Sequence, residues 1–193
     1  VQTLDSQTML PLLVNAAELN SSVYGRYFFI NEDGEMYDTL GITKQYSDEN
    51  YKKATAGISV TVVTDVIEDS TFKQPTFDVM VPVVVDGSVK GVMGSTILVS
   101  DLIDLVSKDL VRGSGHVWMV DQRGEIISHH NEDLVLSKAL IDDDEDITST
   151  EKLLKRIFES SEGIDDYRNS ESEKEYITFS KVSGSPEWYV IIT

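Results

Sequence analysis

The chain has 193 residues, of which 34 are acidic and 16 are basic, giving a formal net charge of −18. A field of that sign repels phosphate backbones and anionic headgroups, so we expect neither nucleic acid nor a lipid surface as a partner. The chain has no cysteine, which excludes disulfides and cysteine-ligated metal sites. Apolar residues make up 40% of the chain, enough to form folded cores.

The chain begins with a helical pattern. Apolar residues recur at three- and four-residue spacings from Leu4 to Leu19, and this predicts a leading helix over about residues 1–20. Pro11 interrupts the pattern, and we expect it to kink the helix or mark a restart.

One stretch of sequence occurs twice. The residues Phe28–Tyr37 return ninety positions later as Trp118–Ile127, and both copies read as an apolar strand, a polar turn closing on Gly-Glu and a second apolar strand. Each copy predicts a β-hairpin. A spacing of ninety residues is too long for a solenoid repeat and fits domain duplication, so we predict two tandem modules with the hairpins in separate sheets.

Turn and cap residues divide the rest of each module. In the first module they predict a hairpin over Tyr24–Gly41, followed by a helix that Ser47 caps and Gly57 ends. A strand over Val60–Val66 comes next. The strands Thr76–Val85 and Val89–Val99 form a second hairpin around Asp86-Gly87, and a helix runs from Ser100 through Val106. In the second module they predict a hairpin over His116–Ser128 and a helix over Asn131–Leu140. A further helix runs from the capping box Thr148–Glu151 to Gly163, and the strands Glu175–Val182 and Glu187–Thr193 close the module. The pattern indicates an α+β fold, with helices packed on antiparallel sheets.

Several short segments occur along the chain in the same order as in a known protein family. They are Tyr46–Gly57, Thr64–Ser70, Val81–Val83 with Gly91–Gly94 and Ile97, His116–Asp121 with Gly124 and His129, and Trp188–Val190. Together they resemble, over nearly the whole chain, the double Cache family of extracellular sensor domains. The resemblance implies two tandem PAS-like modules behind a leading N-terminal helix: residues 1–20 as the helix, 21–111 as the membrane-distal module and 112–193 as the membrane-proximal one.

The same resemblance implies a function. It places the chain in the periplasm or outside the cell, as part of a receptor whose transmembrane helices flank this segment. The distal module would bind a small molecule, and a chemotaxis, histidine kinase or cyclic-dinucleotide output domain would respond. Such receptors signal as homodimers, so we expect an apolar outer face on Leu4–Leu19. A structural or adhesion module without a small-molecule site is the alternative, and an extracytoplasmic enzyme is a third interpretation.

The resemblance also indicates candidate ligand-binding positions. Members that bind α-amino acids use an Arg and aromatics on the short helix, a Tyr and an Asp on the next strand, and an Asp on the last strand. Here these positions fall at Asp48, Asn50 with Tyr51, Ile67 with Asp69, and Thr96, so only Tyr51 and Asp69 keep their residue types. With Phe28 and Tyr46 as further aromatic walls, the candidate ligand-binding residues are Phe28, Tyr46, Asp48, Tyr51, Ile67, Asp69 and Thr96.

The substitution at Asp48 changes the expected ligand. An acid in place of a guanidinium would repel a ligand carboxylate, so we expect a neutral or cationic small molecule rather than an ordinary α-amino acid. The more ordinary interpretation of Asp48 is an acid in the first turn of a helix, where it complements the helix dipole.

Other motifs do not support catalysis or metal binding. The run Asp142–Asp146 lacks the alternation and glycine of a calcium loop and fits a solvated loop better. The adjacent His129 and His130 would point to opposite faces of a strand, so they cannot easily share a tetrahedral metal. No catalytic triad order, phosphate loop or HExxH helix is present. We therefore predict no catalytic residue, no cofactor and no metal.

Overall fold

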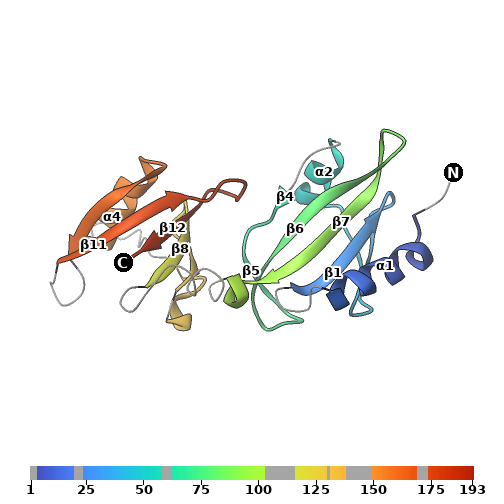
Figure 1. The fold of residues 1–193 in the computed structure, drawn as a ribbon, viewed down its shortest axis with the longest axis horizontal. Helices are drawn as coiled ribbons and strands as arrows, with labels where there is room; N and C mark the ends of the chain where they lie inside the picture. Colours follow the sequence, from blue (N-terminus) through green and yellow to red (C-terminus); the bar gives the residue numbers. More distant parts are fainter. Residues whose placement is uncertain are drawn as a thin grey trace. The chain divides into compact units, whose positions relative to one another are not determined.

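The computed structural model describes residues 4–19, 24–57, 62–102, 116–129, 131–137, 149–168 and 174–193. The chain separates into two compact units, Val1–Leu98 and Val99–Thr193, and each contains one antiparallel sheet with helices (Figure 1). The two predicted hairpins belong to different sheets, and the α+β fold predicted from the sequence is confirmed. The predicted module boundary at residues 112–115 lies outside the described residues.

The first unit is built around a sheet of seven strands in the described residues, in the order β3-β2-β1-β7-β6-β4, with β5 also paired to β6. Its elements in chain order are α1 (Ser6–Leu19), β1 (Tyr24–Asn31), β2 (Glu35–Asp38), β3 (Thr43–Gln45), α2 (Glu49–Thr55), β4 (Val62–Val63), β5 (Ile67–Asp69), β6 (Gln74–Val85) and β7 (Ser88–Leu98).

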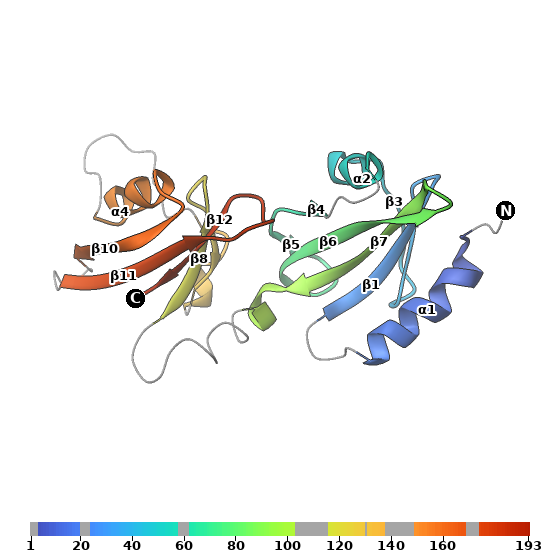
Figure 2. The ribbon, with the colours of Figure 1, turned by 45° about the horizontal axis from the view of Figure 1, so that its top comes forward.

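Helices pack on the two faces of this sheet, as Figure 2 shows for α1 and α2. Alternate residues of a strand point to opposite faces. Tyr27 and Phe29 of β1 therefore pack with Met9 and Leu13 of α1. Phe28, one position along, packs on the opposite face in a cluster that includes Ala54 of α2. The face under α2 is the one that holds the candidate site.

The leading helix forms as predicted but is not broken at Pro11. α1 runs through Pro11, and Asp5 caps its start by accepting the Thr8 N–H through Oδ1 at 2.9 Å. The expected apolar outer face is not formed. The exposed apolar residues flank the face that packs on the sheet, with Leu10 and Val14 on one side and Leu12 and Leu19 on the other, and the exposed Gln7, Asn15 and Glu18 lie between the two flanks.

Two local predictions around α2 were wrong. The residue that caps α2 is Asp48 rather than Ser47, because its side chain accepts the Tyr51 N–H at 2.8 Å. The strand predicted over Val60–Val66 is only β4 in the described part. Thr64 follows β4 and contacts the backbone of β6: its hydroxyl oxygen accepts the Asp78 N–H at 2.8 Å, and its own N–H donates to the Asp78 carbonyl at 2.9 Å.

The long hairpin of β6 and β7 forms where Asp86-Gly87 predicted it. Both turn residues have positive φ, 51° for Asp86 and 77° for Gly87, as a two-residue hairpin turn requires. The pairing runs from Val85 opposite Ser88 to Thr76 opposite Leu98. It sets which side chains of β6 lie beside those of β7 on the α2 face.

The second unit has five strands in its described residues, in the order β10-β11-β12-β8-β9. Its α4 packs on this sheet through an apolar cluster in which Leu153, Leu154 and Ile157 are fully buried. The elements are β8 (Val117–Asp121), β9 (Ile126–Ser128), a 3₁₀ turn η1 (Glu132–Leu134), α4 (Ser149–Phe158), β10 (Glu162–Arg168), β11 (Lys174–Lys181) and β12 (Trp188–Ile192).

The strand β10 was not predicted, because Gly163 was interpreted as the end of the preceding helix. α4 ends at Phe158, and Gly163 lies inside β10 opposite Phe179. A Cβ at Gly163 would lie 2.8 Å from the Cζ of Phe179, so glycine is needed there to let the ring cover the strand. The glycine marks a close contact within a sheet rather than a helix stop.

Two other predicted helices are only partly described. Residues 99–102 are helical, and the rest of the helix predicted through Val106 lies outside the described residues. The helix predicted over Asn131–Leu140 is represented by the 3₁₀ turn η1, with residues 138–140 outside the description. Thr148, His130 and the acidic run at 142–146 also lie outside it.

Candidate functional site

A row of polar side chains crosses the α2 face of the first sheet. Arg26 of β1 lies opposite Thr96 of β7, and Thr96 lies opposite Asp78 of β6. Thr96 is fully buried, and Arg26 is only 8% exposed. We call Arg26, Thr96 and Asp78 the polar row. Its neighbours on the same face, including Phe28 and Met80, belong to the apolar core.

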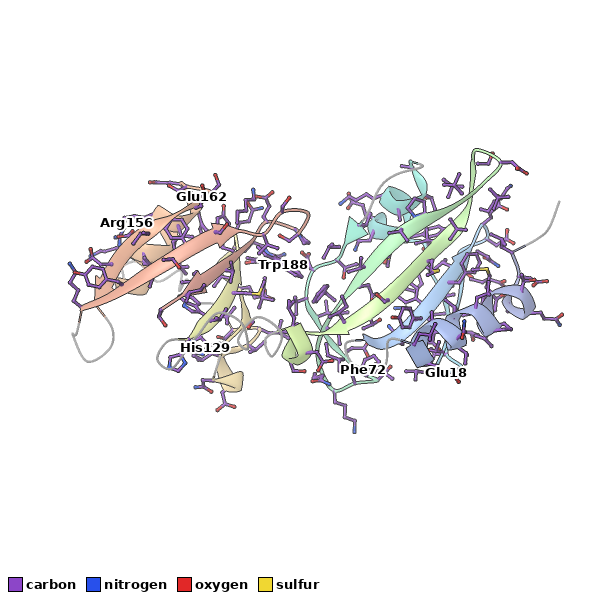
Figure 3. The ribbon with its side chains drawn as sticks, in the orientation of Figure 1. Glu18, Phe72, His129, Arg156, Glu162 and Trp188 are labelled. Carbon is purple, nitrogen blue, oxygen red and sulfur yellow. The ribbon has the colours of Figure 1, made fainter. Side chains whose placement is uncertain are left out.

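The guanidinium of Arg26 lies at the centre of the site. Its Nε donates to Thr96 Oγ1 at 2.9 Å, and its Nη2 donates to Asp69 Oδ2 at 3.4 Å. Its Nη1 lies 3.7 Å from Asp38 Oδ2. The ring of Phe72, labelled in Figure 3, has its centroid 5.8 Å from the guanidinium carbon. Four elements of the unit thus meet around one cation.

Local turns position the two carboxylates that face Arg26. Asp38 Oδ1 accepts the N–H groups of Leu40 and Ile42, at 2.9 and 2.7 Å, directly after β2. Asp69 accepts the N–H groups of the two residues at positions 71 and 72, directly after β5. A bulge in β1 between Tyr24 and Arg26 changes the register where the arginine enters the site.

The carboxyls of the site differ in their acidity. Burial raises the pKa of Asp78, against the opposing effects of the Thr96 hydroxyl, which donates to it at 2.6 Å, and of Arg26. Burial also acts to raise the pKa of Asp69, but the backbone N–H donors and Arg26 outweigh it, so that pKa lies below its ordinary value. Asp69 is therefore a fixed anion, whereas Asp78 binds a proton more readily.

An aromatic pair lies on the same face. The rings of Phe28 and Tyr46 are stacked, with centroids 6.5 Å apart and planes 10° apart, and the ammonium of Lys44 lies 4.8 Å from the Tyr46 centroid. Burial, followed by the charge of Asp78, raises the pKa of Tyr46 to about 12. Its phenol is neutral at physiological pH and can serve as a hydrogen-bond donor.

The structure brings five of the seven predicted residues to this face: Phe28, Tyr46, Tyr51, Asp69 and Thr96. Tyr51 packs against the Phe28 and Tyr46 cluster, while its hydroxyl donates to the Asn31 carbonyl at 2.9 Å. The other two have different surroundings, because Asp48 caps α2 and Ile67 is 59% exposed. The ordinary interpretation of Asp48 as a helix-start acid thus describes its contacts in this structure.

Sequence reasoning missed three residues of the site: Arg26, Asp38 and Asp78. A signal was available, because each is a charged residue within or at the end of a predicted apolar strand. Arg26 lies two positions before Phe28 in β1, and Asp78 lies two positions before Met80 in β6. Residues two apart in a strand share a face, so Arg26 and Asp78 lie on the same side as this apolar core. Charges at core-facing positions of a strand are rare unless paired or functional.

Other kinds of site were also considered. Among the described residues, no three His, Asp or Glu side chains are grouped to hold a metal ion. Within the same residues, no helix has the length and apolar character needed to span a bilayer.

Comparison with known proteins identifies the fold. A family model described as "Cache domain" matches residues 9–193. No curated protein matches the sequence. Among solved structures, the chain is similar to the ligand-binding domain of the amino-acid chemoreceptor PctC of Pseudomonas aeruginosa PAO1 in complex with GABA. The identity is 18%, the TM-score is 0.64, and 100% of this chain and 82% of that chain are covered.

Two further structures resemble the chain. The ligand-binding domain of the Campylobacter jejuni chemoreceptor Tlp3 in complex with 4-methylisoleucine is 17% identical, with a TM-score of 0.66 and coverage of 98% of this chain and 73% of that one. The extracellular domain of the putative histidine kinase mmHK1S-Z2 is 14% identical, with a TM-score of 0.68 and coverage of 98% and 81%. The resemblance predicted from the sequence is confirmed, and a sensor role is favoured over an adhesion module.

Proposed function

Since this chain belongs to the Cache domain family, we propose that its first unit binds a small molecule at the polar row and that occupancy is read by a transmembrane receptor. The chain is a sensor domain of that family. In this proposal residues 21–111 are the membrane-distal, ligand-binding module and residues 112–193 the membrane-proximal one, behind the leading helix of residues 1–20. The domain lies outside the cytoplasm, between transmembrane helices that flank it.

The observation that carries the proposal is the burial of charge on the α2 face. Placing an arginine and several carboxylates in a core costs desolvation energy, and an apolar replacement is often as stable or more stable. On the corresponding face of the second unit, the described residues form an apolar cluster around Trp118 and Leu153. A buried polar site that stability does not require supports a binding role.

The charge of the site supports a neutral or cationic ligand rather than an ordinary α-amino acid. One guanidinium, Arg26, faces the carboxyls of Asp38, Asp69 and Asp78. Its Nε and Nη2 already donate to Thr96 and Asp69, and its Nη1 lies 3.7 Å from Asp38 Oδ2, so a ligand carboxylate would compete with oxygens of the protein for the guanidinium. An ammonium would find carboxylates, the aromatic pair Phe28 and Tyr46, and the phenol donor. The named ligands of the similar chemoreceptors are amino acids, which makes them the competing outcome of any screen.

Calorimetric and thermal-shift screening of the chain tests the proposal. We expect an amine or neutral metabolite to raise the unfolding temperature, because a ligand at 100 times its Kd stabilises the folded state by about 2.7 kcal/mol. Thr96→Val and Asp69→Asn should weaken binding at least tenfold. Ser128→Ala, at a buried position of the second unit, is the matched control and should leave binding unchanged.

Two results would contradict this proposal. Micromolar binding of a standard α-amino acid through its carboxylate would exclude the ligand class. A ligand whose affinity is lowered by Ser128→Ala and is unaffected by Thr96→Val would move the site to the second unit.

We also propose that the full-length receptor is a homodimer that uses the flank of α1 carrying Leu12 and Leu19. Leu12 and Leu19 lie seven residues apart, on the same side of the helix, and are 59% and 75% exposed. Sedimentation of the chain and of the membrane-bound receptor tests this. Leu12→Gln with Leu19→Gln should lower the dimer fraction, whereas Glu18→Gln on the same helix should not; equal fractions in all variants would contradict a dimer through α1.

A further inference from the structure

One carboxylate oxygen of the site has no hydrogen bond. Asp38 is 1% exposed, and its Oδ2 is the one buried side-chain oxygen in the described residues without a hydrogen-bond partner. Its other oxygen is fully used by two backbone N–H groups. A buried, unsatisfied carboxylate oxygen is costly, and a native structure that keeps one calls for an explanation.

The nearest cation does not satisfy that oxygen. Arg26 Nη1 lies 3.7 Å from Asp38 Oδ2, and Arg26 Nη2 lies 3.4 Å from Asp69 Oδ2. Charge-assisted N–H···O bonds to a carboxylate are typically about 2.7–2.9 Å long. The guanidinium therefore lies between two carboxylates, with a long hydrogen bond to Asp69 and none to Asp38.

We infer that Arg26 is an internal cation with two positions: a ligand ammonium takes its place beside Asp69 and Asp78, and the guanidinium then closes on Asp38. This inference rests on the proposed function and adds to it the ligand group and the residue that moves. The ligand class is an organic cation with at least one N–H donor, such as a primary amine or an amidine.

Exposure sets which carboxylate the ligand can reach. The side chain of Asp69 is 12% exposed, whereas that of Asp38 is fully enclosed. Asp78 is partly buried, and its Oδ1 accepts the Thr96 hydroxyl at 2.6 Å. A ligand therefore meets Asp69 and Asp78 first. Asp38 can be satisfied only from inside, by Arg26.

The exchange has a mechanical consequence. Asp69 lies at the end of β5, a three-residue strand, and its Oδ1 holds the turn that contains Phe72. In this structure Arg26 links the turn to β1 and β7 through its hydrogen bonds to Asp69 and Thr96. When Arg26 moves to Asp38, the ligand rather than Arg26 connects the turn at Asp69 to the rest of the sheet. Binding thus selects between two arrangements of the turn, and its effect is limited by the difference in affinity for them.

The test uses ethylammonium chloride and 1,4-diaminobutane as probes, with sodium chloride and sodium acetate at equal ionic strength as controls. We expect the ammonium probes to raise the unfolding temperature above the sodium chloride control, and acetate to give no such rise. Asp69→Asn and Asp78→Asn should each lower the probe affinity at least tenfold. Ser128→Ala again serves as the control with unchanged affinity.

NMR of the Arg26 side-chain Nε–H supplies the readout for movement. Saturation with 1,4-diaminobutane should shift this signal, because Nη1 moves toward Asp38 and the Nε–H bond to Thr96 changes with it. Asp38→Asn should still bind the probe but lose that response. A neutral amide keeps the volume of the side chain and, with the Leu40 and Ile42 donors still in place, its Oδ1 acceptor.

The outcomes separate this inference from the proposed function. An unchanged Arg26 signal at saturating probe, or an equal response in Asp38→Asn, overturns the exchange of partners. A ligand that is neutral or anionic, yet weakened by Thr96→Val, overturns the exchange while leaving the proposed site in place. Probe binding that is insensitive to Asp69→Asn and Asp78→Asn overturns both.

Discussion

The two units use the same strand order but fill one face of the sheet differently. β2-β1-β7-β6 in the first unit corresponds to β9-β8-β12-β11 in the second. In the first, Phe28 lies opposite Gly94; in the second, Trp118 lies opposite Ile191. The first face continues into the polar row, while the second contributes to a cluster of apolar and aromatic side chains under α4. One fold therefore supports either a buried charge site or a plain core.

The first hairpin turn of each unit has the same local structure. Asn31 Oδ1 accepts two backbone N–H groups of its turn, at 3.0 and 2.9 Å, and Asp121 Oδ1 does the same at 2.9 and 2.9 Å. The glycines that follow, Gly34 and Gly124, have φ of 81° and 77°. The two hairpins therefore share one turn geometry, while the core-facing side chains beside them differ.

The largest effect should come from removing the cation of the first unit. Arg26→Ala leaves Asp38 and Asp69 buried without a counter-charge, and breaking a buried ion pair in this way costs about 3–5 kcal/mol. Urea unfolding measures this loss. Arg156→Ala is the control, because the guanidinium of Arg156 is about half exposed and its pair with Asp165 is worth about 0–1 kcal/mol. Equal losses for the two variants would contradict the assignment of Arg26 to a buried charge site.

The second unit should respond as an ordinary core. Leu154→Ala removes a fully buried side chain under α4 and should cost about 2–5 kcal/mol of its stability, through lost burial and the cavity left behind. Hydrogen exchange of β8 and β12 amides reports on this unit specifically. Because its core holds no part of the proposed site, ligand binding at 25 °C should be unchanged; lost binding in a folded variant would show that the two units share the site.

The matched turns should give smaller and similar effects. Asn31→Ala and Asp121→Ala each remove an acceptor for two backbone N–H groups, and we expect each to cost about 1–2 kcal/mol. Hydrogen exchange of the amides at positions 33, 35, 123 and 125 measures the loss. Asp121→Asn keeps the acceptor and should cost less than Asp121→Ala. A cost confined to one unit would weaken the duplication argument.

The smallest effect concerns pH. The pKa of Asp78 is raised on folding, so the folded chain binds that proton more tightly and stability rises as pH falls from the raised value toward 3.8. Asp69 acts in the opposite sense, because its lowered pKa contributes stability that is lost as pH falls below 3.8. Urea unfolding between pH 7 and 3 should show the first contribution in the unaltered chain and lose it in Asp78→Asn. A profile unchanged by Asp78→Asn would contradict the burial effect on that carboxyl.

Much of the fold could be predicted because its signals are local. The Asp86-Gly87 turn, the repeated Gly-Glu turns and the spacing of apolar residues in α1 each act over a few residues, so they are readable without the tertiary structure. The predictions were wrong where a contact with a residue distant in the sequence determines which residue type is needed. Gly163 is needed because Phe179 covers it from the next strand, and nothing in its own neighbourhood shows that.

Some residues of the candidate site could be predicted from the sequence, and others only from the tertiary structure. Types and order of residues indicated a sensor of the Cache family and pointed to Asp69 and Thr96. The tertiary structure alone decided that Arg26 joins them, since it lies 70 positions from Thr96 and 43 from Asp69, and strand register, including the bulge in β1, fixes the face on which it lies. A shift of one residue would turn the guanidinium to the α1 side. Long-range pairing, which local patterns do not encode, therefore determined the charge of this site.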